Sequence, residues 1–215
     1  MICSLTYAMR NATGSALVAA LGGALCLQAQ SPAPPRMGPI PAEAMTEAQA
    51  KAAKEVERRG AVPGYLWPML RNPGLARPTQ MIGEYVNREG KLPKKLTQMA
   101  ILYVSRRLMY NGSWAEHVEM AQREGLRDEI AQAIAAGQRP VNMDQDEQIV
   151  YDMCTELDRT MTISDATYAR AVARLGEAGV VDTIAIYGFY SYLGLFNNAT
   201  RLPPGVAPAF RPPAH

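Results

Sequence analysis

The sequence predicts an all-α fold. Between residues 46 and 202, apolar side chains repeat at helical spacing behind cap residues such as Thr46, Asp144 and Ser164. No stretch alternates polar and apolar residues between hairpin turns, as strands do. The chain has 215 residues, of which 48% are hydrophobic and 20% charged. That length and composition are enough for one domain with a true core.

The first predicted helix begins after Thr46, which has Gln49 as its capping-box partner, and it ends at Gly60. Prolines then break the chain up to Pro73 into short turns. The following helices are read from their caps, their apolar stripes and the glycines that end them. They are predicted over 73–90, over 93–108, over 114–125 (capped by Asn111 or Ser113), over 126–137, 144–160 and 164–179, and as a strongly apolar last segment over 180–202.

Residues 1–29 are predicted to be a secretory signal peptide. Arg10 precedes an apolar run over 15–27, which is shorter than the about 20 residues that a membrane span needs. An uncleaved anchor, or a true start at Met37 or Met45, are the alternatives. A real leader predicts a periplasmic or secreted protein, and its absence predicts a cytoplasmic one.

Proline-rich segments flank the predicted domain. Residues 30–45 are predicted to be a linker and 203–215 a disordered tail, which leaves 46–202 for the helical domain. The net charge of +2 offers no basic excess for nucleic acid. After removal of the leader we expect no stable membrane span, because Asp182 and several polar tips interrupt the last apolar segment.

His117 is the main candidate for catalysis. The chain holds only 2 His and 3 Cys, so we expect neither a histidine-rich metal site nor any other cofactor. If the leader is removed, Cys154 is the remaining thiol, and its place on an apolar helix face predicts a buried, inert cysteine. An imidazole can act as acid or base near neutral pH. A packed core histidine is the alternative.

Several neighbours could build a site around this histidine. Ser113 and Trp114 lie about one turn before it on the same helix face, and Tyr110 can approach them. Arg106 and Arg107 precede the break in the chain, and either could hold a substrate carboxylate. A solvated helix C-terminus is the alternative for these two arginines.

Four motifs follow one another in a set order between residues 65 and 204. They are Leu92-Pro93 with Leu96 and Ala100, then Trp114-Ala115-Glu116-His117, then Gly188-Phe189-Tyr190, and finally Asn197 to Pro203. Their order and spacing resemble the carboxymuconolactone decarboxylase family, which is similar to alkylhydroperoxidase D-like proteins. The resemblance implies an all-α fold assembled as homo-oligomers, trimers or hexamers, with sites between helices near the subunit contacts.

Two departures from the family pattern bear on the chemistry. The places of the Cys-x-x-Cys of peroxidase members are Tyr110 and Ser113, so that disulfide cannot form. The family glutamate is Gln98, and an amide does not relay a proton as a carboxylate does. The resemblance therefore favours a cofactor-free lyase acting on a small carboxylated lactone or cyclic acid, with His117 as general acid and Tyr110 and Ser113 beside it. The candidate substrate-binding residues are Trp114, Arg106, Arg107, Gln98, Glu116, Tyr190 and Asn197.

Two other functions stay open. One is a peroxidase of the alkylhydroperoxidase type, which would have to use Cys154 as its reactive thiol. The other is a non-catalytic, exported, oligomeric binding protein, which the leader and the substitutions at the family positions favour. The substrate and the oligomeric state depend on contacts that the sequence does not show.

Overall fold

The computed structural model describes residues 35–202, which belong to one compact unit and form helices and no strands. The predicted all-α fold is confirmed. The predicted leader, the first residues of the linker and the tail with His215 lie outside the described residues. The longer helices are α1 (Glu47–Val56), α2 (Ala76–Glu84), α3 (Lys94–Arg107), α4 (Asn111–Arg123), α5 (Asp128–Ala135), α6 (Gln145–Thr160) and α7 (Asp165–Thr200). Short helical turns are η1 (Ala42–Ala44), η2 (Gly64–Leu66), η3 (Met69–Arg71), η4 (Pro73–Leu75) and the π-helical η5 (Tyr85–Glu89).

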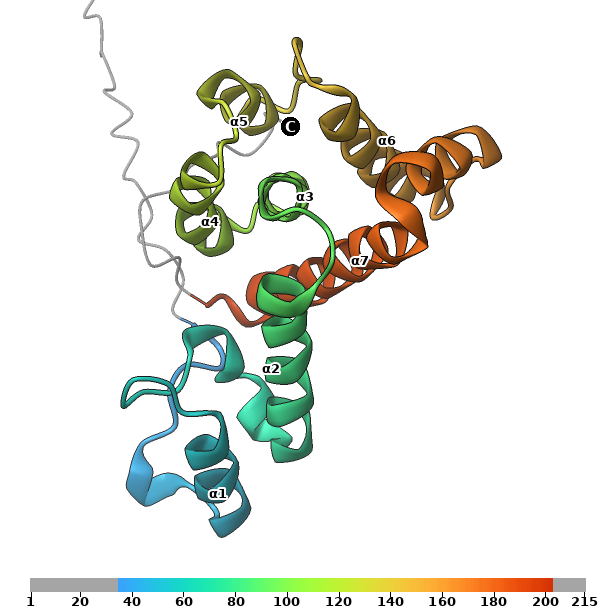
Figure 1. The fold of residues 1–215 in the computed structure, drawn as a ribbon. Coiled ribbons are helices and arrows are strands. Elements are labelled where there is room, and N and C mark those ends of the chain that lie inside the picture. Colours follow the sequence, from blue (N-terminus) through green and yellow to red (C-terminus); the bar gives the residue numbers. More distant parts are fainter. Residues whose placement is uncertain (1–34, 203–215) are drawn as a thin grey trace, which may run out of the picture. The chain divides into compact units, whose positions relative to one another are not determined.

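Helix α3 lies at the centre of the fold. Figure 1 looks nearly along α3 and shows α4, α5, α6 and α7 around it, in agreement with the contacts among these helices. Because α3 has neighbours on most sides, its apolar side chains are buried around much of its circumference. Leu96, Met99, Ile101, Leu102 and Val104 are each almost completely inaccessible to solvent. The broad apolar pattern of this segment therefore reflects a central helix.

The polar caps predicted at Thr46, Asp144 and Ser164 are present, whereas α4 begins after Tyr110 without a side-chain cap, so the cap predicted at Asn111 or Ser113 is wrong. Thr46 accepts a hydrogen bond from the backbone N–H of Gln49, whose side chain accepts in return from the N–H of Thr46. Ser164 caps α7 by accepting from the N–H of Thr167, without a reciprocal bond. Each such cap satisfies N–H groups that the first helical turn leaves without partners.

Three helix ends differ from the prediction, and the first is that of α1, which ends at Val56 and not at Gly60. The segments 164–179 and 180–202 were expected to be separate helices, but α7 continues past Gly179 and is broken earlier, at Gly176. Gly176 has φ +69° and ψ 168°, a conformation that a residue with a Cβ rarely adopts. The segment 73–90 does not end as a regular α-helix either, because its last turn is the π-helix η5.

The strongly apolar last segment of the sequence forms the C-terminal part of α7. Among residues 35–202 it is the one helix that is long and apolar enough to span a membrane, and half of its most apolar window is buried in the fold. Buried core helices meet the same criterion. Ile186, Phe189 and Leu193 pack into the core, while Val181 and Leu195 stay exposed. The predicted homo-oligomer stays a prediction that such an exposed apolar face would suit.

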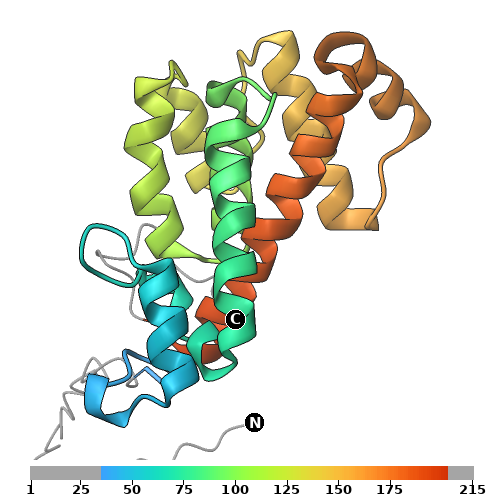
Figure 2. The ribbon, with the colours of Figure 1, turned by 60° about the horizontal axis from the view of Figure 1, so that its bottom comes forward.

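Helix α2 lies against the C-terminal part of α7, which is red in Figures 1 and 2. Thr79 and Tyr192 are joined by a hydrogen bond of 3.2 Å, and the Tyr85 hydroxyl donates to Asp182 at 3.0 Å. These contacts place η5 beside the middle of α7. As a result, residues of η5 lie close to residues of α4.

We expect Gly194→Ala to destabilise the fold by about 2 kcal/mol. A Cβ at Gly194 would lie 2.7 Å from Leu108 Cδ1 and 3.2 Å from Leu108 Cβ, so the chain entering α4 would have to move. Gly188 on the same helix is the matched control, because a Cβ there meets no described atom within 4 Å. Gly188→Ala should stabilise α7 by about 0.5–1 kcal/mol. Urea denaturation measures both, and equal effects at the two positions would contradict the close packing at Gly194.

Candidate active site

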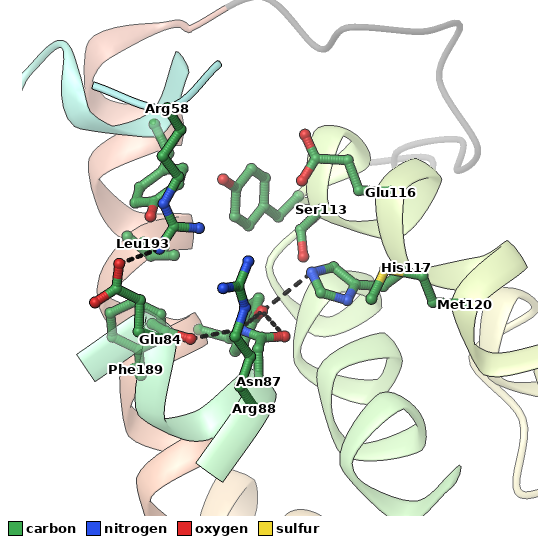
Figure 3. A pocket seen from close by; sticks show the side chains of 14 residues that line it. Arg58, Glu84, Asn87, Arg88, Ser113, Glu116, His117, Met120, Phe189 and Leu193 are labelled. Atoms are coloured by element: carbon green, nitrogen blue, oxygen red, sulfur yellow. Dashed lines mark hydrogen bonds and ion pairs between the residues drawn. The ribbon is translucent and has the colours of Figure 1, made fainter. Parts of the chain in front are cut away.

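His117 lies on α4 with its ring at the wall of a cavity of about 270 Å³ (Figure 3). The side chain is 7% exposed. Tyr110, which directly precedes α4, and Ser113 in its first turn line the same cavity. The three predicted catalytic residues therefore share one space. Tyr190 of α7 and Asn87 of η5 close the cavity on the opposite side.

A chain of hydrogen bonds holds the imidazole in place. The amide Nδ2 of Asn87 donates to the carbonyl of Gly83 at 2.9 Å and to the hydroxyl of Tyr190 at 3.0 Å. His117 Nδ1–H donates to Gln98 Oε1 at 2.7 Å, so Nε2 accepts from the Tyr190 hydroxyl at 3.0 Å, and Asn87 Oδ1 at 3.2 Å is a second acceptor for the same hydroxyl. Because the amide oxygen of Gln98 only accepts, the proton of the neutral ring sits on Nδ1. Nε2 is the basic atom that faces Tyr190.

Burial keeps both members of this pair uncharged. It lowers the pKa of His117 from 6.5 to about 4, because the protonated ring would lose its hydration. Burial also raises the pKa of Tyr190 far above its usual value. At neutral pH a protonated phenol thus donates to a neutral imidazole. His117 and Tyr190 also contact each other edge to face, with ring centroids 5.3 Å apart.

The cavity also contains charged side chains from the N-terminal part of the domain. Arg58 is paired with Glu84 at 2.5 Å, and Arg77 approaches the same carboxylate at 3.4 Å. The hydrogen bond from Arg58 is the main reason why the pKa of Glu84 lies below its usual value. The charge of Arg58 is therefore largely compensated before any ligand enters.

Arg88 differs from Arg58, because it makes no ion pair or side-chain hydrogen bond with any residue in 35–202. Figure 3 shows its guanidinium pointing into the space between Arg58 and His117. It is carried by η5, whose π-helical turn inserts one residue relative to an α-helix and directs Asn87 and Arg88 toward the cavity. Arg88 is therefore available to bind an anionic group in front of the imidazole.

Four of the other predicted site residues lie in four different places. Glu116 lines the cavity and keeps an exposed side chain, and partial desolvation by the surrounding protein raises its pKa. Gln98 lies behind His117 as its hydrogen-bond partner and is buried. Asn197 lines an adjoining cavity of about 480 Å³, which shares Arg58, Tyr65, Tyr110 and Glu116 with the first. Trp114 points away from both cavities and packs in a second core cluster with residues of α3 and α5.

Arg106 and Arg107 do not lie beside His117, which corrects the expectation that they would bind its ligand. Both line a different cavity, between α3 and α6. Arg106 Nε donates to the carbonyl of Ala135 at 2.7 Å, and Arg107 Nε pairs with Asp158 at 2.6 Å. Successive residues near the end of α3 project toward α5 and α6, and the spacing along the chain could not show on which side those helices pack.

Cys154 is buried in the core and does not line the His117 cavity. Burial raises the pKa of its thiol to about 12, so the nucleophilic thiolate is scarce at neutral pH. In the part of the chain that the structure describes, no three His, Cys, Asp or Glu side chains are grouped so that they could hold a metal ion. The groups that line the His117 cavity are thus an imidazole, phenols, guanidinium groups and the carboxyl groups of Glu84 and Glu116.

Sequence reasoning missed Arg58, Asn87 and Arg88. The first follows α1 and the other two belong to η5, and no motif marks any of them. The one available signal was the tyrosine-rich last segment, which places a hydroxyl from α7 near the histidine. The partner of that hydroxyl, Asn87, could be found only from the fold.

Comparison with known proteins identifies the fold. No family model and no curated protein matches the chain. A crystal structure matches it, described as an alkylhydroperoxidase AhpD core, an uncharacterized peroxidase-related protein from Ralstonia eutropha JMP134. The TM-score is 0.64, with 15% sequence identity, over 80% of this chain and 94% of that one. At this identity the likeness is one of fold, and the predicted alkylhydroperoxidase D-like fold is confirmed.

Proposed function

We propose that this protein is a cofactor-free lyase of the carboxymuconolactone decarboxylase type, acting on a small carboxylated lactone or cyclic acid. The observation that carries the proposal is the Tyr190–His117–Gln98 chain at the wall of a cavity into which Arg88 points. A proton-transfer pair and an uncompensated cation are the groups that a decarboxylation without a metal or cofactor requires.

In the proposed reaction the carbon–carboxylate bond breaks, carbon dioxide leaves, and its bonding electrons stay on the ring as an enolate-like carbanion. That carbon then takes one proton, so the balanced reaction consumes one proton from solvent. The Tyr190 hydroxyl gives its proton to that carbon, and His117 Nε2, after taking up a proton from solvent, returns one to the phenolate. A bound anionic substrate raises the pKa of His117 from its low resting value, which favours this exchange.

Arg88 has the complementary role in this proposal. Its guanidinium binds the anionic group of the substrate and stabilises the negative charge that develops on the ring. Tyr110 and Ser113 shape the same cavity, and Ser113 is held by a hydrogen bond from Ser105 at 2.9 Å. The cavity of about 270 Å³ suits a small molecule of this class.

Steady-state decarboxylation of γ-carboxymuconolactone tests the proposal. We expect turnover by the wild type, a kcat lowered about 100-fold by His117→Gln, and a KM raised about tenfold by Arg88→Gln. Arg123→Gln, an equal charge change on the exposed end of α4, is the control and should leave both constants unchanged. Equal turnover by wild type and His117→Gln would disprove the role of His117. Saturable binding of the lactone without turnover would instead indicate a non-catalytic binding protein.

A thiol peroxidase is the second candidate, and the fold shared with a peroxidase-related protein favours it. Within residues 35–202 it would have to use Cys154, whose thiol is buried and has a raised pKa. Loss of peroxide consumption in Cys154→Ser would support this function. Consumption that survives the substitution would eliminate Cys154 as the reactive thiol.

A further inference from the structure

The cavity at His117 adjoins the larger cavity of about 480 Å³, and four residues line both of them. Apart from these four, the wall of the larger cavity is mainly apolar and includes Pro39, Pro63, Trp67 and Leu202. Trp67 also packs against the main core, so this wall is part of the folded domain. A ligand bound at His117 therefore has adjoining apolar space into which it can extend.

Two phenol hydroxyls at the junction of the cavities form no hydrogen bond with any residue in 35–202. They belong to Tyr65, which is partly buried, and to Tyr110, which is 7% exposed. Buried hydroxyls are normally hydrogen-bonded, as that of Tyr190 is to Asn87 and His117. The hydroxyls of Tyr65 and Tyr110 thus lack the kind of protein partner that Tyr190 has.

Both hydroxyls are able to donate to a ligand. Burial is the main reason why the pKa of Tyr65 and that of Tyr110 lie above their usual value. Each phenol therefore keeps its proton at neutral pH, and each lines both cavities. A carbonyl oxygen of a ligand at this junction is the complementary group, because it accepts hydrogen bonds and carries no charge.

The charged side chains indicate which end of a ligand lies in which cavity. Arg88 lines the His117 cavity alone. Arg58 lines both cavities, but its charge is compensated by Glu84 at 2.5 Å. An anionic group in the larger cavity would lie beside the carboxyl of Glu116 and would find no other arginine or lysine in the lining. The anionic end therefore belongs at Arg88, and the part in the larger cavity should be uncharged.

We propose that the larger cavity is a second subsite, which holds an uncharged, mainly apolar substituent of the ligand whose anionic group Arg88 binds. At the junction, the Tyr110 and Tyr65 hydroxyls donate hydrogen bonds to a carbonyl oxygen of that ligand. The class of ligand is thus a ring carboxylate with a neutral acyl group that ends in an apolar or aromatic part. The inference rests on the anion site of the proposed function, but it does not require decarboxylation.

Calorimetric titration of the full-length protein with three carboxylates tests the subsite. Benzoate has the anionic ring alone, 4-benzylbenzoate adds a second ring, and 4-benzoylbenzoate adds the second ring and a carbonyl. We expect 4-benzylbenzoate to bind about tenfold more tightly than benzoate, because the second ring is buried. We expect 4-benzoylbenzoate to bind about tenfold more tightly again, because its carbonyl accepts from the two phenols.

Substitutions assign these two gains to the residues of the subsite. Trp67→Leu should remove most of the gain from the second ring, and Trp67→Phe should retain it. Tyr110→Phe should weaken 4-benzoylbenzoate about tenfold and leave 4-benzylbenzoate unchanged. Tyr168→Phe changes an exposed tyrosine that lines neither cavity, so it should alter no affinity. Unchanged binding of benzoate shows that each of these variants is folded.

Two results would overturn the subsite. One is equal affinity of the wild type for the three carboxylates, and the other is a gain from the second ring that Trp67→Leu leaves intact. The proposed function fails in a different way. Benzoate binding that Arg88→Gln leaves unchanged would contradict its anion site. Turnover of the lactone together with equal affinities for the three probes would support the proposed function and reject the subsite.

Discussion

Lowering the pH from 7 to 4 should destabilise the wild-type protein by about 3 kcal/mol more than the His117→Gln variant. The buried imidazole has a pKa of about 4 in the fold and an ordinary value of 6.5 in the unfolded chain. Between these values the unfolded chain binds a proton that the folded protein does not. The free energy of unfolding therefore has its full contribution from His117 above pH 6.5 and loses it as the pH falls to 4.

Urea denaturation of both proteins at pH 7, 5.5 and 4 measures this difference. The carboxylates titrate in wild type and variant alike, so they cancel in the comparison. Glu116, whose raised pKa gives a contribution of the opposite sign, cancels in the same way. Parallel pH profiles for the two proteins would show that the imidazole is hydrated in the fold, and they would contradict the buried pair with Tyr190.

The helices of this fold could be predicted because their signals are local. Thr46, Asp144 and Ser164 cap helices as their sequence neighbourhoods indicate. The central position of α3 also follows from the sequence, because only a helix with neighbours on several sides carries apolar residues around most of its surface. The break in α7 was misplaced, since Gly176 and Gly179 are equally plausible helix ends until the packing is known.

The candidate site could be predicted only in part. His117, Tyr110 and Ser113 share one segment of chain, so helical spacing was enough to group them. Arg88 and Asn87 reach the same cavity through a π-helical turn, a change of register that no residue pattern marks. The prediction that Arg106 and Arg107 lie beside His117 was wrong for a related reason. Their distance along the chain from His117 is short, but α3 directs them to the face on which α5 and α6 pack.

The structure shows the environment of Tyr110 and Ser113, the two residues that differ from the Cys-x-x-Cys of peroxidase members. Where the redox cysteines of peroxidase members would stand, this chain has a phenol with a raised pKa and a hydroxyl bonded to Ser105. Both side chains line the cavity and shape it, but neither is a redox group. Gln98 likewise cannot relay a proton, but it fixes the Nδ1–H form of His117 and leaves Nε2 as the basic atom. In the function proposed above, these three side chains suit proton transfer and not thiol chemistry.

Asp182→Ala should destabilise the protein by about 3 kcal/mol. This carboxylate, which interrupts the apolar run of α7, is 2% exposed and accepts hydrogen bonds from three groups. They are the Tyr85 hydroxyl at 3.0 Å, the backbone N–H of Leu92 at 3.0 Å and the backbone N–H of Lys91. The chain passes so near that a Cβ at Gly90 would lie 3.1 Å from Asp182 Oδ2. Alanine would remove the acceptor of the buried Leu92 N–H and of the part-buried Lys91 N–H and Tyr85 hydroxyl.

Two variants separate this anchor from a general effect of changing α7. Asp182→Asn keeps one acceptor oxygen, so it should cost about half as much, and Tyr85→Phe removes only the exposed bond and should cost under about 1 kcal/mol. Urea denaturation at pH 7 gives all three values. Because the loop held by Asp182 connects η5 to α3, the loss should also loosen Asn87 from Tyr190. Asp182→Ala could lower the free energy of unfolding no more than Tyr85→Phe does. The backbone N–H groups of Lys91 and Leu92 would then have other acceptors, and Asp182 would not be the residue that holds η5 against α7.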